Sequence, residues 1–345
     1  GEVRLMRMYW SEVATSTRPD ADGTIGAGDI YYYDDEYRAH SAVPVPAFSD
    51  DKYARGVVGL VAGSDTYPGA GILATRGALA AGVGMARLNS TRRVQDLVLA
   101  DQPGVVMVGG RIQAALIGPG LDEERREDAL ELAQFCGTSG LPLVIDAWAL
   151  DLVPELLGSL TADATVLTPH YGEAARLLSA LGTPITKREV AASPLRYARA
   201  LHEATGCHIV LKGPVTIVYS FEYVDVDAEE NSATSVDGTD SGADARPEFT
   251  RVYEPTVSAT STSWAGIAGN GDVLAGFIAG ILARASARGG AGSRSQCVTS
   301  ARLSAAVCLH ARAADAAANQ HNGGAPIQAN DIVAAIPSVL ADRRP

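Results

Sequence analysis

The sequence predicts an α/β fold with a mainly parallel central sheet and helices on both of its faces. Between residues 56 and 212, short apolar runs alternate with longer amphipathic segments, the pattern of strands joined by crossover helices. Aromatic residues make up only 6% of a chain rich in alanine and aliphatic residues, which is typical of α/β proteins. Polar residues follow several apolar runs, namely Ser64, Asp146, His170 and Lys212. Because ligands bind at the carboxyl ends of parallel strands, we expect these residues at one functional edge.

Each expected strand is a short, continuous apolar run, as in strands that are buried on both faces. These runs lie at residues 56–62, 105–108, 115–117, 143–146, 165–168 and 208–212. The expected helices are longer and lie at residues 70–85, 122–136, 171–181, 187–205, 272–284, 298–318 and 332–340. In the segment 272–284, Gly276 and Gly280 lie off the apolar face, where they allow a neighbouring element to approach closely.

Two segments depart from this pattern and set the expected domain boundaries. Residues 1–50 are interpreted as an acidic, aromatic arm or linker, and residues 51–345 as the main domain. Within that domain, residues 221–250 contain nine Asp or Glu and one Arg. Because such a segment has little apolar surface to bury, we expect a solvated, mobile insertion at about 221–258.

Charge and cysteine usage exclude several classes of function. A net charge of −12 argues against nucleic-acid and anionic-membrane partners. The four cysteines have no CxxC spacing, so we expect buried thiols in a reducing cytosol and neither a zinc site nor a redox pair. The chain has no uninterrupted apolar run of membrane-spanning length, and residues 1–10 lack the apolar core of a signal peptide. These features predict a cytoplasmic location.

The glycine-rich run at residues 268–276 leads directly into an apolar helical stretch and carries one carboxylate, Asp272. Glycines and a helix N-terminus together present N–H groups and a partial positive charge, an arrangement suited to phosphate. Asp272 at its edge could accept a proton from a hydroxyl that is being phosphorylated. The alternative is that Asp272 merely stabilises the helix, by about 0.3–1 kcal/mol. The helix N-terminus is also expected to lower the pKa of Asp272, so proton removal would be concerted with phosphoryl transfer.

Two further loops have both a binding and a purely structural interpretation. Residues 63–70 join a strand to a helix and are either a Ser or Thr N-cap with a Pro-Gly turn or a backbone cradle for a ligand. Lys212, followed by Gly213, is either a phosphate ligand at a strand end or an exposed lysine in a hairpin turn. The residues by themselves leave both alternatives open.

The histidines differ in how much their surroundings indicate. His170 lies where a helix begins and could hydrogen-bond a ligand, while Thr168 could cap the same helix with Pro169 at its first position. The remaining histidines of the main domain have no partner pattern and are expected to be structural or exposed; they are His202, His208, His310 and His321.

Taken in order, these motifs resemble the ADP/ATP-dependent NAD(P)H-hydrate dehydratase family, which has a ribokinase-like fold. The resemblance covers residues 51–340 apart from the acidic insertion, and its motifs lie at 52–56, 62–70, 118–121, 145–150, 168–173, 212–213 and 271–276. The family repairs hydrated nicotinamide cofactors: a nucleotide phosphorylates the 6-hydroxyl of (S)-NADHX or (S)-NADPHX, and elimination of phosphate restores NADH or NADPH.

The resemblance implies a role for each matching residue. Asp272 is the expected catalytic base at the substrate hydroxyl. The expected contacts to the hydrate are Ala70, Gly120, His170 and Asp272. The expected contacts to ADP or ATP are Lys212, Gly213, Pro214, Val215, Thr216 and Gly271. Mg²⁺ is expected with the phosphates, without a metal site built from protein side chains.

The resemblance also implies partners. Bacterial members generally prefer ADP, many are tetramers, and an NAD(P)H-hydrate epimerase domain is often fused upstream. We therefore expect a homotetramer with the epimerase as functional partner, and we interpret residues 1–50 as a remnant of the connecting linker.

At two positions the sequence departs from the family, because Ile267 replaces a hydroxyl residue and Asn270 a smaller one. These departures motivate one alternative, a nucleotide-binding protein that has lost catalysis. A second alternative is a kinase of a small alcohol, such as a vitamin precursor or sugar, on the same fold.

Overall fold

The computed structural model describes residues 31–32, 42–225, 249–253, 255–260, 262–289, 297–320 and 324–341. Within these residues, nine strands form one sheet in the order β1-β11-β8-β7-β6-β5-β4-β2-β3. The strands are β1 (Tyr31–Tyr32), β2 (Val57–Val61), β3 (Met85–Asn89), β4 (Ala114–Ile117), β5 (Leu143–Ile145), β6 (Thr165–Leu167), β7 (His208–Leu211), β8 (Thr216–Tyr219) and β11 (Thr256–Ser258). Strands β2 to β7 are parallel to one another, and β8 is antiparallel to both of its neighbours. The prediction of a mainly parallel sheet is confirmed.

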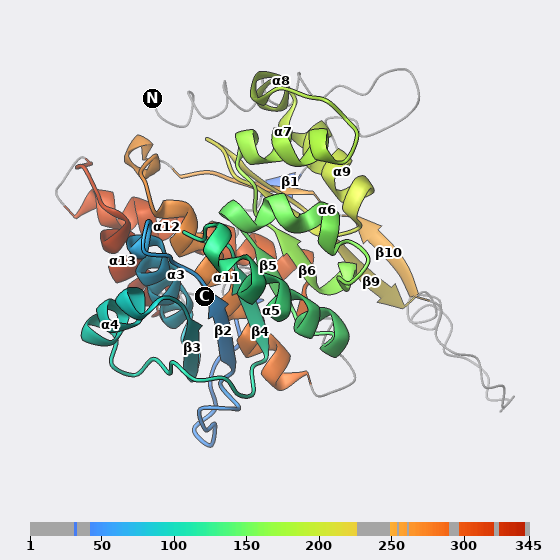
Figure 1. Cartoon of the computed structure of the whole chain (residues 1–345). Helices are drawn as coiled ribbons and strands as arrows, with labels where there is room; N and C mark the ends of the chain where they lie inside the picture. Colours follow the sequence, from blue (N-terminus) through green and yellow to red (C-terminus); the bar gives the residue numbers. More distant parts are fainter. Residues whose placement is uncertain are drawn as a thin grey trace, which may run out of the picture.

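Helices cover both faces of the sheet, as predicted (Figure 1). One face is covered by α3 (Pro68–Ala80), α4 (Arg92–Asp101), α11 (Asn270–Arg288), α12 (Ser300–Asn319) and α13 (Ala329–Ala341). The other face is covered by α5 (Arg126–Ser139), α6 (Val153–Leu156), α7 (Tyr171–Ala180), α8 (Lys187–Ala192) and α9 (Pro194–Thr205). Figure 1 shows the blue α3 beside the orange and red α11 to α13, with the green helices grouped across the strands. Within the described residues, no helix is both long and apolar enough to span a bilayer.

The continuous apolar runs follow from this layering. In β4, Ala114 and Leu116 pack under α11, while Ala115 and Ile117 pack under α5. Because successive side chains of a strand point to opposite faces, a strand covered on both sides is apolar at most of its positions.

Glycines bring α3 and α11 into close contact. A Cβ added to Gly276 would lie 2.0 Å from the carbonyl oxygen of Ala74, and one added to Gly77 would lie 2.3 Å from that of Val273. No real Cβ fits at these distances, so the two helices meet backbone to backbone. The expected close approach at Gly276 is confirmed, and it holds the first turn of α11 against α3.

Three predicted elements differ from the structure. The helix expected at 70–85 ends at Ala80, and β3 follows it as an edge strand whose mixed polarity hides it from a search for apolar runs. Residues 105–108 contribute only an isolated bridge between Val106 and Arg87. The helix expected at 187–205 is broken into α8 and α9, because Pro194 starts a new helix and lacks the N–H that a continuing helix needs.

The segment before residue 51 contacts the main domain. Val43 is 2% exposed and belongs to the core, and Arg284 of α11 donates hydrogen bonds to the carbonyl oxygens of Ala81 and Pro44. Strand β1 pairs in parallel with β11 at the sheet edge. The rest of the expected arm lies outside the described residues.

The expected insertion at 221–258 is ordered at both ends. Strands β9 (Phe221–Asp225) and β10 (Phe249–Tyr253) form an antiparallel pair. Strand β11 belongs to the central sheet, and its Val257 is 1% exposed. The boundary at 258 is therefore wrong, because a short strand can be buried whatever the composition of the segment before it. Residues 226–248 lie outside the described residues.

Candidate active site

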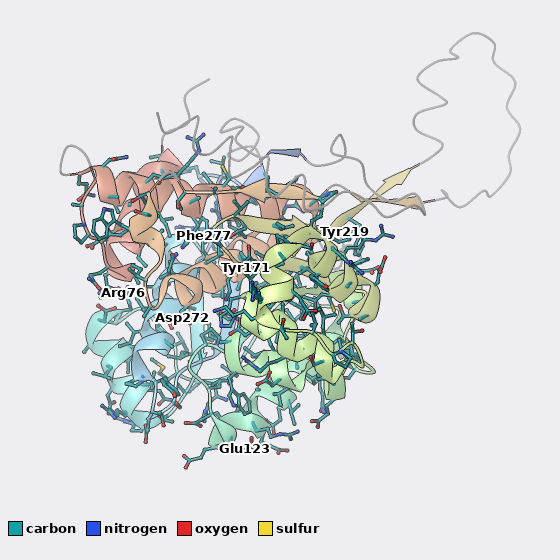
Figure 2. All side chains as sticks on the ribbon, turned by 90° about the horizontal axis from the view of Figure 1, so that it is seen from above. Arg76, Glu123, Tyr171, Tyr219, Asp272 and Phe277 are labelled. Carbon is teal, nitrogen blue, oxygen red and sulfur yellow. The ribbon has the colours of Figure 1, made fainter. Side chains whose placement is uncertain are left out.

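The polar residues that follow the strands meet the first turn of α11 at the carboxyl edge of the sheet. Asp146 follows β5, Thr168 follows β6 and Lys212 follows β7. A Cβ added to Gly271 in α11 would lie 3.1 Å from Lys212 Nζ, so lysine and helix are in contact. Figure 2, seen from above, shows Asp272 at the start of α11 and Tyr171 at the start of α7 toward the middle of the molecule. The expected functional edge is present.

Lys212 takes part in a buried ion pair. Its Nζ donates a hydrogen bond to Asp146 Oδ1, and Thr168 Oγ1 donates to the same oxygen at 2.7 Å. The Asp146 side chain is 1% exposed and that of Lys212 is 17% exposed. Burial acts to lower the pKa of Lys212, but the negative charges around it, Asp146 foremost, outweigh burial and raise that pKa. Strands β7 and β8 form a hairpin, as the structural alternative predicted. That alternative also predicted an exposed lysine, and this part of it is wrong.

Asp272 combines a helix N-terminus with an environment that disfavours its charge. Gly269 is the N-cap with φ of +85°, and Asp272 lies in the first turn behind it. Burial, followed by the charge of Asp146, raises the pKa of Asp272 from 3.8 to about 7; Lys212 acts in the opposite direction and Glu173 in the same one.

The expected lowering of the pKa of Asp272 is therefore wrong. A helix N-terminus contributes about 0.3–1 kcal/mol, less than the roughly 1.4 kcal/mol that corresponds to one pKa unit. Burial beside two other carboxylates exceeds this contribution. Asp272 is thereby suited to accept a proton near neutral pH.

His170 and Glu173 hold the start of α7 in a capping box. His170 Nδ1 accepts hydrogen bonds from the backbone N–H groups of Gly172 and Glu173, each at 3.0 Å, and Glu173 Oε2 accepts from His170 N at 2.7 Å. The helix cap is therefore His170, and the prediction that Thr168 caps it is wrong, because the Thr168 hydroxyl is used by Asp146. The His170 side chain is 54% exposed and lines the cleft described below, with its Nε2 3.4 Å from Glu173 Oε1.

Ala70 and Gly120 lie side by side although they are far apart in sequence. A Cβ added to Gly120, which has φ of +64°, would lie 2.6 Å from Ala70 Cβ. The N-cap of α3 is Tyr67, which makes no side-chain capping hydrogen bond, so the predicted Ser or Thr cap is wrong. The first N–H groups of α3 therefore lack a side-chain cap, as the backbone-cradle alternative requires.

A cleft of about 810 Å³ opens beside Lys212 and the start of α11. Five of the six residues expected to contact nucleotide line it: Lys212, Gly213, Pro214, Thr216 and Gly271. Val215 is instead half-buried against the core under α7 to α9. Of the four residues expected to contact the hydrate, His170 also lines this cleft, whereas Asp272, Ala70 and Gly120 are outside the lining.

Sequence reasoning missed His310 of α12, which lines the same cleft and is 5% exposed. Burial lowers the pKa of His310 to about 4, and the charge of Lys212 acts in the same direction. A hydrogen bond with the backbone of Asn270 acts in the opposite direction and raises that pKa. The ring is therefore neutral at pH 7. In the part of the chain that the structure describes, neither His310 Nε2 nor Asn270 Oδ1 has a hydrogen-bond partner, although both are buried. A polar residue within an apolar helical stretch was the available signal.

The departures from the family pattern lie in this cleft. Both Ile267 and Asn270 line it, and Asn270 Nδ2 donates to the Ala265 carbonyl at 2.8 Å. Among the described residues, no group of three His, Cys, Asp or Glu side chains is arranged to hold a metal ion.

The fold and the site together define an α/β protein with a half-buried carboxylate, Asp272, and a lysine, Lys212, at the start of α11, and comparisons with known proteins give its family. The model of the NAD(P)H-hydrate dehydratase family matches residues 58–240, more than half of the chain. The chain belongs to this family.

Among its relatives, the bifunctional NAD(P)H-hydrate repair enzyme Nnr of Mycobacterium tuberculosis is 37% identical over 248 residues, which are 70% of this chain and 43% of that protein. The ADP-dependent (S)-NAD(P)H-hydrate dehydratase of Xanthomonas campestris is 30% identical over 70% of this chain and 78% of its own length. The chain thus spans less than half the length of its bifunctional relatives.

Solved structures show the same fold. The ADP/ATP-dependent NAD(P)H-hydrate dehydratase of Bacillus subtilis, co-crystallised with ATP and Mg²⁺, matches 92% of this chain and 99% of its own with a TM-score of 0.65 at 21% identity. A ribokinase-like superfamily protein of Enterococcus faecalis matches 93% of this chain and 99% of its own with a TM-score of 0.69 at 21% identity. The predicted ribokinase-like fold is confirmed.

Proposed function

We propose that this protein is an ADP- or ATP-dependent (S)-NAD(P)H-hydrate dehydratase. The observation that carries the proposal is the position of Asp272, a half-buried carboxylate with a pKa of about 7 in the first turn of α11. It is accompanied by Lys212, whose ammonium lies against Gly271 beside the cleft. A base and a cation at one helix N-terminus suit phosphoryl transfer to an alcohol.

The reaction proceeds in two stages. In the first, Asp272 accepts the proton of the substrate 6-hydroxyl as its oxygen forms a bond to the terminal phosphorus of the nucleotide. The bond between that phosphorus and the bridging oxygen of the nucleotide breaks, and the shortened nucleotide leaves as ADP from ATP or as AMP from ADP. In the second, the C6–O bond breaks as phosphate leaves, and loss of a proton from the neighbouring ring carbon forms the double bond of NADH or NADPH.

The residues of the cleft divide the binding tasks. Lys212 and the backbone around Gly213 and Gly271 bind the nucleotide phosphates, because N–H groups and an ammonium converge there. Ala70 and Gly120, which lie outside the cleft lining, contact the hydrate together with His170, which lines the cleft. Mg²⁺ bound with the nucleotide would be held by phosphate oxygens and water, because the described residues form no metal-binding group of three, and it would neutralise phosphate charge.

The partners proposed for this chain follow from its relatives. The Mycobacterium tuberculosis relative is a bifunctional repair enzyme, which supports an NAD(P)H-hydrate epimerase as functional partner. The Xanthomonas campestris relative is ADP-dependent, which favours ADP as the phosphoryl donor here. The homotetramer and the cytoplasmic location stay predictions.

The decisive experiment is to incubate the protein with NADHX, Mg²⁺ and either ADP or ATP, and to follow the absorbance of NADH and the release of phosphate. Recovery of NADH with equal release of phosphate supports the dehydratase. A stable phosphorylated product of another alcohol would support the kinase alternative. Nucleotide binding without any turnover would support the protein that has lost catalysis, with Ile267 and Asn270 as its motivating departures.

A further inference from the structure

Behind the residues that face the ligands lies Asp146, which the proposed function does not use. It is 1% exposed and does not line the cleft, yet it accepts hydrogen bonds from both Lys212 and Thr168. We propose that Asp146 is a positioning residue: it holds the Lys212 ammonium against the first turn of α11, the turn that carries Asp272. This inference rests on the proposed function.

The backbone holds Asp146 in one place. Its N–H donates to the Ile117 carbonyl at 3.1 Å, and a Cβ on Gly118 would lie 1.8 Å from the Asp146 carbonyl oxygen. Ala147 has φ of +49°, a left-handed conformation that is unfavourable for a residue with a Cβ and turns the chain sharply after Asp146. Strain of this kind persists only where the surrounding structure determines the conformation, so the carboxylate is preorganised.

The two hydrogen bonds on Asp146 Oδ1 determine where the lysine points. A lysine on a hairpin turn has four rotatable bonds and no preferred direction, so a fixed acceptor is needed to place its charge. Here the acceptor is fully buried, and the ammonium it holds lies against Gly271, where a side chain at residue 271 would contact it. The positive charge is therefore in place before nucleotide arrives.

The charge of Asp146 also acts on the base. The groups that face Asp272 are Asp146 after β5, Glu173 in α7 and Lys212 after β7. The two carboxylates favour the protonated form of Asp272 and the lysine favours the ionised form. Removing the charge of Asp146 therefore lowers the pKa of Asp272 and weakens it as a base.

The test is Asp146→Asn, which keeps the size of the side chain and one oxygen acceptor, removes the charge and replaces the second oxygen by an NH₂ donor. In the wild type, activity rises with pH as Asp272 loses its proton near pH 7. In the variant we expect this acidic limb of the kcat profile to move to lower pH by about one unit, the smaller end of the effect of a nearby charge. We also expect a lower kcat on the plateau, because Asp272 is then a weaker base.

Asp101→Asn is the matched control. Asp101 is also a carboxylate paired with a cation, Arg76, but it is not among the groups that act on the pKa of Asp272. We expect its pH profile to coincide with that of the wild type. A purely structural role for Asp146 would lower the stability of Asp146→Asn without moving the limb, and that result would overturn the proposal.

A second readout separates this inference from the proposed function. The carboxyl ¹³C signals of aspartate can be titrated in the free protein, with Asp272→Asn identifying the signal of Asp272. A shift of that titration to lower pH in Asp146→Asn supports the inference even if NADHX is not turned over. An unchanged titration refutes it even if the wild type is an active dehydratase. If Asp146→Asn does not fold, Asp146→Ser, which also accepts hydrogen bonds without charge, is titrated in the same way.

Discussion

Replacing Gly276 by alanine tests whether the contact of α3 with α11 sets the geometry of the site. The new Cβ would lie 2.0 Å from the carbonyl oxygen of Ala74, 2.9 Å from its carbonyl carbon and 3.0 Å from the Ala78 nitrogen. All three atoms are backbone, so no side chain can rotate away and the helices must separate. Ordinary carbon–oxygen contacts are longer by about 1 Å, and overpacking of this kind costs about 1–3 kcal/mol.

Alanine also has the higher helix propensity, which returns about 0.8–1.0 kcal/mol and leaves a net loss of up to about 2 kcal/mol. With an unfolding entropy of about 2.1 cal/mol/K per residue, a loss of about 2 kcal/mol in a domain of roughly 300 residues lowers Tm by about 3 °C. Ala70 lies in the first turn of α3 and Asp272 in the first turn of α11, so separating the helices also moves these two residues of the hydrate site apart. We therefore expect a larger fold-change in kcat than in the Kd for nucleotide.

Thermal unfolding and steady-state kinetics measure both effects. Gly158→Ala is the control, since nothing lies within 4 Å of its added Cβ and its φ is not in the left-handed region. We expect its Tm and kcat to match those of the wild type. A Gly276→Ala protein with unchanged Tm would show that α3 and α11 are not in backbone contact.

Three further variants test the remaining assignments. Asp272→Asn is expected to lower kcat by about 10²–10⁴-fold, the usual contribution of a general base, and to spare ADP affinity; near-wild-type turnover would remove this residue from the mechanism. Lys212→Ala is expected to weaken ADP binding by about 10- to 100-fold and hydrate binding less, measured by calorimetry alongside Tm because Asp146 loses its partner; equal ADP affinity would contradict a phosphate contact. Replacing residues 226–248 with a short Gly-Ser linker is expected to preserve Tm and activity because the segment is acidic and loop length has a small entropic effect of about 0.6 kcal/mol per doubling; a large fall in Tm would mean that it packs as structure.

Much of the fold could be predicted from the sequence because its signals are local. A continuous apolar run such as 115–117 is buried on both faces wherever it is placed, so its strand was predictable. The glycine-rich start of α11 and the proline at residue 194 act on their own neighbours, although the break caused by that proline was missed. Strands β3 and β11 were also missed, because an edge strand of mixed polarity and a three-residue strand have no distinctive local pattern.

For the site, too, the local features could be predicted from the sequence and the contacts between distant residues could not. The sequence by itself determined which residue types follow the strands and that Asp272 and Lys212 lie in motifs suited to phosphate. Only the tertiary structure decided that Lys212 is paired with Asp146, that His310 reaches the nucleotide cleft, and that the pKa of Asp272 is raised. The physical reason is that pairing, burial and pKa are sums over groups brought together from distant parts of the chain, whereas a helix N-terminus acts only on its own first turn.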